Sequence, residues 1–252
     1  MEVLKDDPTR PVIRIGDTVR RATGWSPAVH RPLDGLEAAA FEASPRVLGI
    51  DPDGRETLTY VDGDSGAVGF SNVVSEQGLY RFAALLRSFH DHSRLLSFGA
   101  ETEWALGTRP SPLGEVICHS DFAPWNIVWR GYEPVGILDW DFALPGPAIH
   151  DVAYALDYAV PFRDDDACLR AHGFDNPPDR KHRISVFADG YGLASTTGLV
   201  DAVIDRLRLD DDNVRTLAER GLEPQVSWVR TGRGTESSAR IPWIEQHRRL
   251  LE

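Results

Sequence analysis

An Asp and an Asn lie five residues apart in ICHSDFAPWNIVW, the stretch that spans residues 117–129. Asp121 and Asn126 are followed by a second stretch, ILDWDF, which adds Asp139 and Asp141. Asp and Asn are common in loops because their side chains cap turns. The same oxygen-bearing side chains are also ligands that Mg²⁺ uses when it is shared with phosphate groups. The surrounding elements decide between these two interpretations.

Three short apolar runs around these residues predict strands at 115–119, 126–129 and 135–139. A turn with Gly and Pro separates the last two runs, so we expect them to form a hairpin. Hairpin strands lie about 5 Å apart, which brings Asn126 close to Asp139 at one end. Asp121, at the end of the preceding strand, lies near them. Phosphoryl transfer needs a metal at the phosphates and a group that orients the acceptor hydroxyl, and Asp121 is available for the second task.

The stretch HSDFAPWN resembles the H-x-D-x-x-x-x-N catalytic loop of protein-kinase-like enzymes. Together with ILDWDF and PGPAIHDVAYAL, it resembles the aminoglycoside phosphotransferase and choline kinase branch of that fold. The resemblance covers about residues 12–160. It implies an α+β, protein-kinase-like fold with two lobes, the N-terminal one β-rich and shortened, the C-terminal one mostly helical. It also implies an enzyme that moves the γ-phosphoryl group of ATP or GTP to a hydroxyl of a small molecule.

The resemblance assigns a role to each matching residue. Asp121 is the expected catalytic base, and Asn126 and Asp139 are the expected ligands of Mg²⁺. His119 and Asp151 are expected to give the loop structural support. A helix-start carboxylate is an equally good interpretation of Asp151.

Two further acids are candidates for the substrate side. Asp141 either faces a cationic acceptor or pairs with a neighbouring basic residue. Asp157 is consistent with an amine-bearing acceptor and equally with a solvated helix face. The acceptor is expected to be a hydroxylated small molecule, aminoglycoside-like or of another kind, with a cationic compound among the options.

Residues 1–62 are predicted to form the reduced N-lobe on the nucleotide side. Residues 63–252 are predicted to hold the catalytic loop and the acceptor-binding helices. Within the N-lobe we expect four strands and one helix, at 11–22 (two strands), 26–43 (the helix, with Ser26 as its cap), 46–50 and 56–61. Tyr60 and Val61 form the hinge that follows, where the resemblance places the nucleotide.

The N-lobe departs from the family pattern in two ways. Residues 1–24 contain only Gly16 and Gly24, so the chain is expected to begin near the second strand of the sheet, without a glycine-rich loop. The lysine of the third strand is replaced, with Arg20 as the first candidate and Arg21 as the other. These departures leave an alternative open, a catalytically weak or inactive kinase-like binding or regulatory module.

The composition excludes several other classes of function. The 252 residues carry 27 basic and 39 acidic groups, and this net charge of −12 repels nucleic acid and anionic lipid. The chain has no apolar run of about 18 residues, so no membrane span is expected. Its two cysteines form no metal or disulfide pattern, which indicates a reduced, cytoplasmic protein. The oligomeric state stays open.

A metal-dependent hydrolase is the third interpretation and ranks last. It would need a dense cluster of His and Asp, whereas the eight histidines are scattered along the chain. His90 and His92 are interpreted as an exposed helix end.

Overall fold

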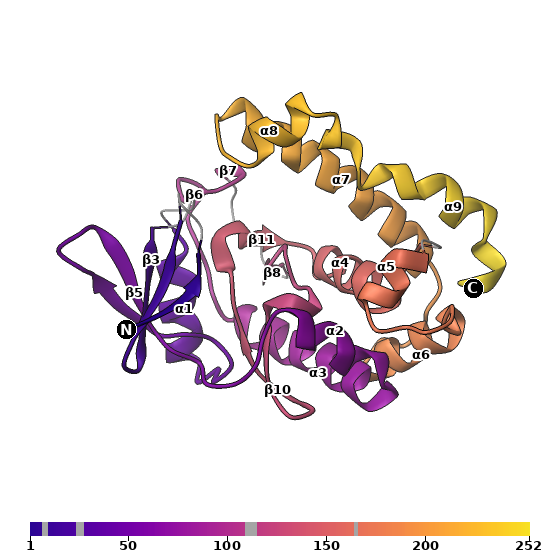
Figure 1. The fold of residues 1–252 in the computed structure, drawn as a ribbon, viewed down its shortest axis with the longest axis horizontal. Coiled ribbons are helices and arrows are strands. Elements are labelled where there is room, and N and C mark those ends of the chain that lie inside the picture. Colours follow the sequence, from indigo (N-terminus) through magenta and orange to yellow (C-terminus); the bar gives the residue numbers. More distant parts are fainter. Residues whose placement is uncertain (7–9, 24–27, 109–114, 164–165) are drawn as a thin grey trace.

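A small antiparallel sheet lies at one end of the protein, and helices make up most of the other end (Figure 1). The computed structural model describes residues 1–252 except 7–9, 24–27, 109–114 and 164–165. The sheet has five strands in the order β1 (Glu2–Lys5), β2 (Val12–Ile15), β3 (Thr18–Ala22), β5 (Arg55–Thr59) and β4 (Val47–Ile50). A strand-rich smaller part and a helical larger part confirm the predicted α+β class.

The edge strand β1 corrects one expectation. The sequence predicts a sheet that begins near its second strand, but Val3 of β1 pairs with Ile13 of β2. All four residues of β1 are exposed, so this strand has no buried apolar pattern that could predict it. The connection between β1 and β2 contains no glycine, and residues 7–9 within it lie outside the described residues.

The two predicted hairpins of the sheet are present. Gly16 turns the chain from β2 into β3 with a φ of +60°, a conformation that glycine adopts without strain. Strands β4 and β5 pair across the turn at residues 51–54. Helix α1 (His30–Ala38) lies between the hairpins in the chain and is shorter than the predicted range. Its expected cap, Ser26, lies outside the described residues.

Two helices follow the sheet, α2 (Ala67–Val74) and α3 (Glu76–Ser93). Ser75 caps α3 by accepting a hydrogen bond from the backbone N–H of Gly78. One face of α3 carries an apolar stripe at helical spacing, and its members are fully buried: Leu79, Phe82, Leu86 and Phe89. The lobe boundary after residue 62 stays a prediction.

Short strands carry the motif region and pair in twos. They are β6 (Glu103–Trp104) with β7 (Gly107–Thr108), β8 (Val116–Cys118) with β11 (Leu144–Gly146), and β9 (Ile127–Arg130) with β10 (Glu133–Ile137). The chain changes direction between these strands in two one-turn 3₁₀ helices, Pro124–Asn126 after β8 and Trp140–Phe142 after β10. The β9–β10 hairpin confirms the predicted pairing of the motif strands.

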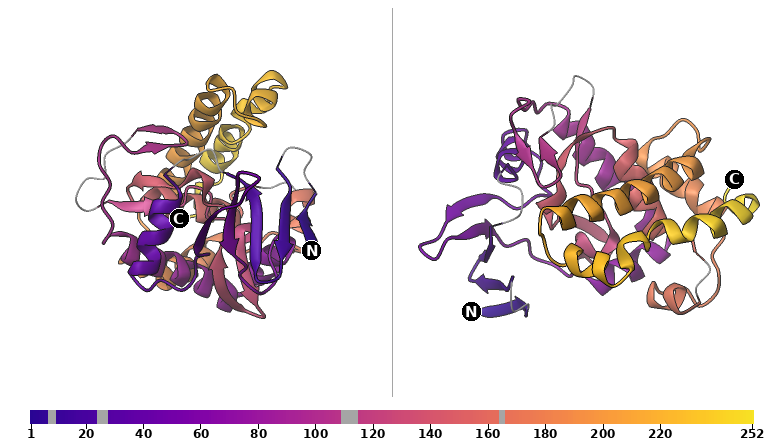
Figure 2. Two further views of the ribbon diagram at one scale, coloured as in Figure 1. Left: turned by 90° about the vertical axis from the view of Figure 1, so that its left-hand side faces the viewer. Right: turned by 90° about the horizontal axis from the view of Figure 1, so that it is seen from above.

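Helices form the rest of the described chain. They are α4 (Ile149–Ala159), α5 (Asp166–Ala171), α6 (Arg180–Tyr191), α7 (Leu199–Glu219), α8 (Gln225–Arg230) and α9 (Ile241–Gln246). The long helix α7 lies alongside α8 and α9 on the side of the molecule away from the sheet (Figures 1 and 2). Among the described residues, every helix is too short or too polar to cross a lipid bilayer.

One apolar core joins α3, α4, α6 and α7 to the motif strands. Trp129 and Trp140 are each 1% exposed and pack in this core. Gly69 of α2 lies so close to the motif that an added Cβ would stand 1.8 Å from the carbonyl oxygen of Pro124. Tight packing at these points fixes the loop that carries Asp121.

Candidate active site

Asp151 holds the loop that follows β8. Its carboxylate accepts hydrogen bonds from the backbone N–H groups of His119, at 2.6 Å, and Ser120, at 2.8 Å. Ser120 has a φ of +66°, a left-handed conformation that is uncommon for a residue other than glycine. The two hydrogen bonds offset the energetic cost of this conformation. They hold the turn between the end of β8 and Asp121.

His90 is a support residue that the sequence interpretation missed. It is fully buried rather than at an exposed helix end, because it lies on the inner face of α3. One ring nitrogen lies 3.2 Å from Asp151 Oδ2 and the other 2.7 Å from the hydroxyl of Tyr191. Burial raises the pKa of Asp151, but the hydrogen bond to His90 and nearby positive charge outweigh it, and the pKa lies below its ordinary value.

His119 joins the loop to the end of β10. Its Nε2 donates to the carbonyl oxygen of Leu138 at 2.9 Å, and its Nδ1 accepts from the backbone N–H of Asp121 at 3.3 Å. These partners assign the neutral tautomer with its proton on Nε2. Burial lowers the pKa of His119, which keeps the ring neutral. The side chain therefore lies where the predicted support role would place it.

Asp121 is held on both carboxylate oxygens. The hydroxyl of Tyr154 donates to Oδ1 at 2.6 Å, and the amide of Asn126 donates to Oδ2 at 2.9 Å. Burial raises the pKa of Asp121 to about 7, with a further rise from Asp139, while the two hydrogen bonds act in the opposite direction. A carboxyl group that titrates near neutral pH is suited to accept a proton in a reaction.

Arg206 of α7 supports Tyr154 from behind, and no sequence pattern singled it out. Its guanidinium carbon lies 4.7 Å from the centre of the Tyr154 ring. It donates to the carbonyl oxygen of Ser120 at 2.7 Å and to Asp210 at 2.8 Å. The C-terminal helices thus help to position the loop.

Asn126 and Asp139 lie at the same end of the β9–β10 hairpin. Ile127 pairs with Ile137, so the residues just outside this pair are brought together. The backbone N–H of Leu138 donates to the carbonyl oxygen of Asn126 at 2.8 Å. Asp139 adopts a φ of +61°, and its side chain is 46% exposed. Such backbone conformations cost about 1–3 kcal/mol and cluster at functional sites.

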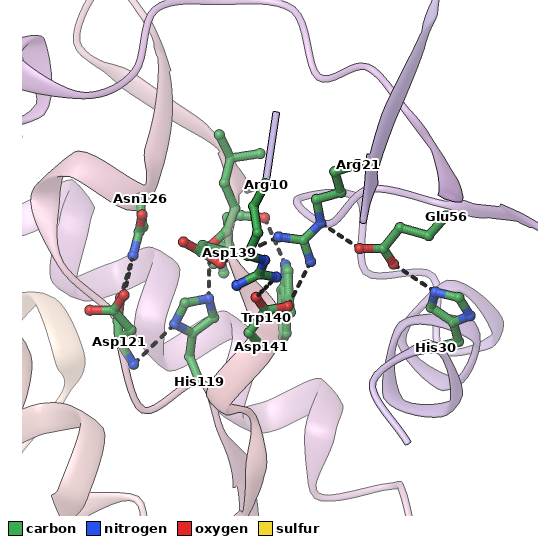
Figure 3. Close-up of polar contacts among 12 residues, drawn as sticks. Arg10, Arg21, His30, Glu56, His119, Asp121, Asn126, Asp139, Trp140 and Asp141 are labelled. Carbon is green, nitrogen blue, oxygen red and sulfur yellow. Dashed lines mark hydrogen bonds and ion pairs between the residues drawn. The ribbon is translucent and has the colours of Figure 1, made fainter. Parts of the chain in front are cut away.

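These two residues fit a magnesium ion that is shared with phosphates. Asn126 binds Asp121 through its Nδ2 atom, so the side-chain carbonyl oxygen of Asn126 is directed away from that bond (Figure 3). Asp139 supplies carboxylate oxygens next to it. Hard oxygen donors in small number are the ligands with which Mg²⁺ binds a nucleotide.

Arg21, and not Arg20, is the arginine of β3 that enters this site. Neighbouring side chains on a strand point to opposite faces, so only one of the two can do so. Arg20 lies 3.3 Å from Asp51 on the other face of the sheet. Arg21 forms ion pairs with the buried Glu56 and, at 3.4 Å, with Asp139 (Figure 3).

Asp141 and Asp157 do not lie where an acceptor would meet them. Asp141 is 2% exposed and binds Arg10 and Arg21. The side chain of Asp157 is 3% exposed and binds Arg163, at 3.1 Å, and Arg240, at 2.8 Å. Asp141 therefore pairs with basic residues, which is the second of its two expected roles. Asp157 neutralises arginines of the protein itself and is buried, so neither the substrate-side role nor the solvated helix face expected for it is right.

Two cavities meet at the motif. The larger, of about 450 Å³, is lined by residues of the sheet and of the β9–β10 hairpin, among them Val19, Leu58, Tyr60, Val61, Asn126 and Asp139. The smaller, of about 370 Å³, is lined among others by Asp121, Trp125, Tyr154, Tyr158, Asp210 and Trp228. Since Asn126 lines one and Asp121 the other, the hydrogen bond between them lies where the cavities adjoin.

The hydrolase interpretation gains no support. Within the described part of the chain, no group of three or more His, Cys, Asp and Glu side chains could together hold a metal ion.

The chain resembles known proteins in sequence and in fold. The chain is 33% identical to the trifolitoxin immunity protein of Rhizobium leguminosarum bv. trifolii, over 96% of this chain and 93% of that protein. Residues 91–182 match the sequence profile described as "Phosphotransferase enzyme family".

Solved structures share the fold at low identity. An amicoumacin kinase solved with AMP-PNP and Ca²⁺ has a TM-score of 0.61 at 12% identity, covering 94% of this chain and 87% of that one. A choline kinase from Cryptosporidium parvum has a TM-score of 0.61 at 10% identity, covering 99% and 90%. The solved structures that share its fold include aminoglycoside phosphotransferases and choline kinases. This protein-kinase-like fold, the matched profile and the curated relative lead to one assignment. The chain belongs to the phosphotransferase enzyme family.

Proposed function

We propose that this protein is a small-molecule kinase that moves the γ-phosphoryl group of ATP or GTP to an alcohol. One observation carries the proposal. Asp121 lines the smaller cavity, Asn126 lines the larger, and a hydrogen bond of 2.9 Å joins their side chains. A nucleotide in the larger cavity and an alcohol in the smaller one would therefore meet at this hydrogen bond.

The larger cavity suits the nucleotide. Val19 and Leu58 offer apolar contact for a base, and Tyr60 and Val61 lie where the chain leaves the sheet. Asn126 and Asp139 would hold Mg²⁺, which when bound would neutralise the charge of the phosphates.

Asp121 would act on the acceptor. Its carboxylate would accept the hydrogen bond of the acceptor hydroxyl and take the proton as the hydroxyl oxygen bonds to the γ-phosphorus. The bond from that phosphorus to the β–γ bridging oxygen would break. The products are a nucleoside diphosphate and a phosphate monoester. Tyr154 and Asn126, which each bind one carboxylate oxygen, would keep Asp121 in line for this step.

The residues that line the smaller cavity indicate the chemistry of the acceptor. Its walls carry aromatic rings, including Trp125, Tyr158 and Trp228. Among its described lining residues the carboxylates are Asp121 and Asp210, and Asp210 is already paired with Arg206 at 2.8 Å. Aromatic faces can accept one ammonium group, but several amines would lack partners here. We therefore favour an acceptor with an apolar or aromatic body and one positive charge at most.

The relative suggests a biological setting. Its name assigns it to immunity against trifolitoxin, and it aligns with 96% of this chain. We infer that this protein protects a cell by phosphorylating a growth-inhibiting compound. An inactive regulatory module is the weaker alternative, because Asp121, Asn126 and Asp139 are all present and the sheet has its first strand.

The test is an acceptor screen. The protein is incubated with Mg²⁺ and ATP or GTP against hydroxylated antibiotics and metabolites, and transfer is followed by ³¹P NMR. We expect a phosphate monoester with the wild type and none with Asp121→Asn. Asp189→Asn, which changes an exposed carboxylate of α6, is the matched control and should keep full activity. Equal turnover by Asp121→Asn and the wild type would overturn the assignment.

A further inference from the structure

Two arginines reach the larger cavity from separate parts of the sheet. Arg10 lies just before β2, and Arg21 lies on β3. Both line the cavity together with Asp139, the residue assigned to the metal. The end of the cavity where phosphates would bind therefore carries guanidinium groups, although β3 has no lysine and the segment before it has no glycine-rich sequence.

A single carboxylate holds both arginines. Arg10 Nη2 lies 2.6 Å from Oδ2 of Asp141, and Arg21 Nη2 lies 2.9 Å from Oδ1 (Figure 3). Each oxygen thus takes one guanidinium. Asp141 lies in the 3₁₀ helix Trp140–Phe142, two residues after Asp139, so the arginines are tied to the segment that carries the candidate metal ligand.

The exposed fractions show which groups face the cavity. The side chain of Asp141 is 2% exposed, whereas those of Arg10 and Arg21 are 26% and 15% exposed. Glu56, the second partner of Arg21, is 0% exposed and also binds His30 at 2.7 Å. Asp141 also lines the cavity, but Asp141 and Glu56 are almost fully buried, so the arginines expose more of their side chains to a ligand than these acids do.

A guanidinium has the chemistry for this position. It carries five N–H donors in a planar fork, so it can bind a carboxylate oxygen and a phosphate oxygen at the same time. Bonds from Arg to phosphate are charge-assisted and about twice as strong as neutral hydrogen bonds. A buried carboxylate that lost its partners would be costly, so Asp141 keeps the arginines in place when no ligand is bound.

We propose that Asp141 is a positioning residue that presents Arg10 and Arg21 to the β- and γ-phosphates of the donor. This inference rests on the proposed function, since it takes the occupant of the larger cavity to be a nucleotide. The arginine pair would replace the glycine-rich loop and the β3 lysine as the phosphate-binding groups of this chain.

A phosphate-dependent binding series tests the proposal. The affinities of wild type and Asp141→Asn for ATP, ADP, AMP and adenosine are measured by calorimetry at fixed Mg²⁺. We expect the variant to lose roughly tenfold or more in affinity for ATP and ADP, the factor that one charge-assisted hydrogen bond contributes. Its affinity for adenosine should not change.

Three outcomes would overturn the inference. An equal loss for adenosine would make Asp141 a purely structural residue, and no loss for ATP would make it irrelevant to the phosphates. A loss that vanishes when Mg²⁺ is removed would mean that Asp141 acts through the metal. If the wild type binds no nucleotide or adenosine at all, the proposed function itself fails, and that result is distinct from these three.

Two further variants keep the test sound. Arg10→Gln, which changes a side chain at the edge of the sheet, should show the same phosphate-dependent loss even if Asp141→Asn does not fold. Arg20→Gln is the matched control, because Arg20 neighbours Arg21 on β3 but pairs with Asp51 on the other face. It should bind all four ligands as the wild type does.

Discussion

Asn126 donates two hydrogen bonds to Asp121, one to its carboxylate and one to its backbone carbonyl oxygen, each at 2.9 Å. The one-turn 3₁₀ helix at Pro124–Asn126 folds the chain back so that residues five apart can make this contact. The spacing of the motif is therefore a geometric requirement. It holds the candidate base and the candidate metal ligand together where two cavities adjoin.

Removing the hydroxyl of Tyr154 should shift the pH dependence of the reaction. Its hydrogen bond lowers the pKa of Asp121, so Tyr154→Phe raises that pKa above its present value of about 7. The acidic limb of the kcat profile should move to higher pH, and kcat at pH 7 should fall by roughly tenfold, about one hydrogen bond.

The neighbouring Tyr158→Phe is the control for this shift. Tyr158 lines the same cavity, but no hydrogen bond joins it to Asp121. Its acidic limb should stay in place. An unmoved limb in Tyr154→Phe would show that the hydroxyl does not tune Asp121.

Neutralising Asp121 should stabilise the protein at high pH. The pKa of Asp121 in the folded state, about 7, lies above its ordinary value of 3.8, so the folded state holds the proton more tightly than the unfolded state. Stability from this group is present below pH 3.8 and is lost as the pH rises through about 7. Asp121→Asn removes this loss, and its gain over the wild type should reach on the order of 1–3 kcal/mol at pH 8.

Urea denaturation without Mg²⁺ and nucleotide, at pH 5 and pH 8, measures this difference. A gain that is equal at both pH values would contradict a raised pKa for Asp121.

His30 should make stability depend on pH in the neutral range. A hydrogen bond to Glu56 raises the pKa of His30 above its ordinary value of 6.5. The stabilisation is therefore fully present below pH 6.5 and is lost as the pH rises through the higher folded-state pKa. His30→Gln should show a flatter dependence of Tm on pH above 6.5, measured by calorimetry. The same slope in both proteins would rule out a contribution from His30.

Gly69→Ala should destabilise the protein by about 1–3 kcal/mol, the usual cost of overpacking. The new methyl group would lie 1.8 Å from the carbonyl oxygen of Pro124, a backbone atom that cannot move without shifting the catalytic loop. At Gly35 the three atoms nearest to an added Cβ all belong to the end of the Leu96 side chain, which can rotate away. Gly35→Ala is therefore the control. The midpoints of denaturant unfolding of the two variants are compared, and the midpoint of Gly69→Ala should be the lower one. Equal midpoints would mean that α2 does not press on the loop.

The parts of the site that are local in sequence could be predicted. The strands around Asp121 and the hairpin that joins Asn126 to Asp139 follow from short patterns. Each needs only the periodicity of one element or the geometry of one turn.

The parts of the structure that depend on contacts between residues far apart in the sequence could not be predicted. Asp157 pairs with Arg240, which is 83 residues further along the chain. The sequence gives no sign of this partner, so sequence patterns alone suggest that the charge of Asp157 is available to a ligand. The choice between Arg20 and Arg21 depends on which face of β3 is turned to the cavity, and a shift of one residue reverses it. Strand β1 is exposed throughout and gives no pattern of its own.

The most direct test of the central claim is a calorimetric titration of ATP and of GTP, with and without Mg²⁺, into the wild type and Asp139→Asn. We predict that the wild type binds at least one of the two nucleotides, that binding is tighter with Mg²⁺, and that Asp139→Asn loses this dependence. A folded wild type that binds neither nucleotide would contradict the kinase function. The family fold would then serve as a binding module in this protein.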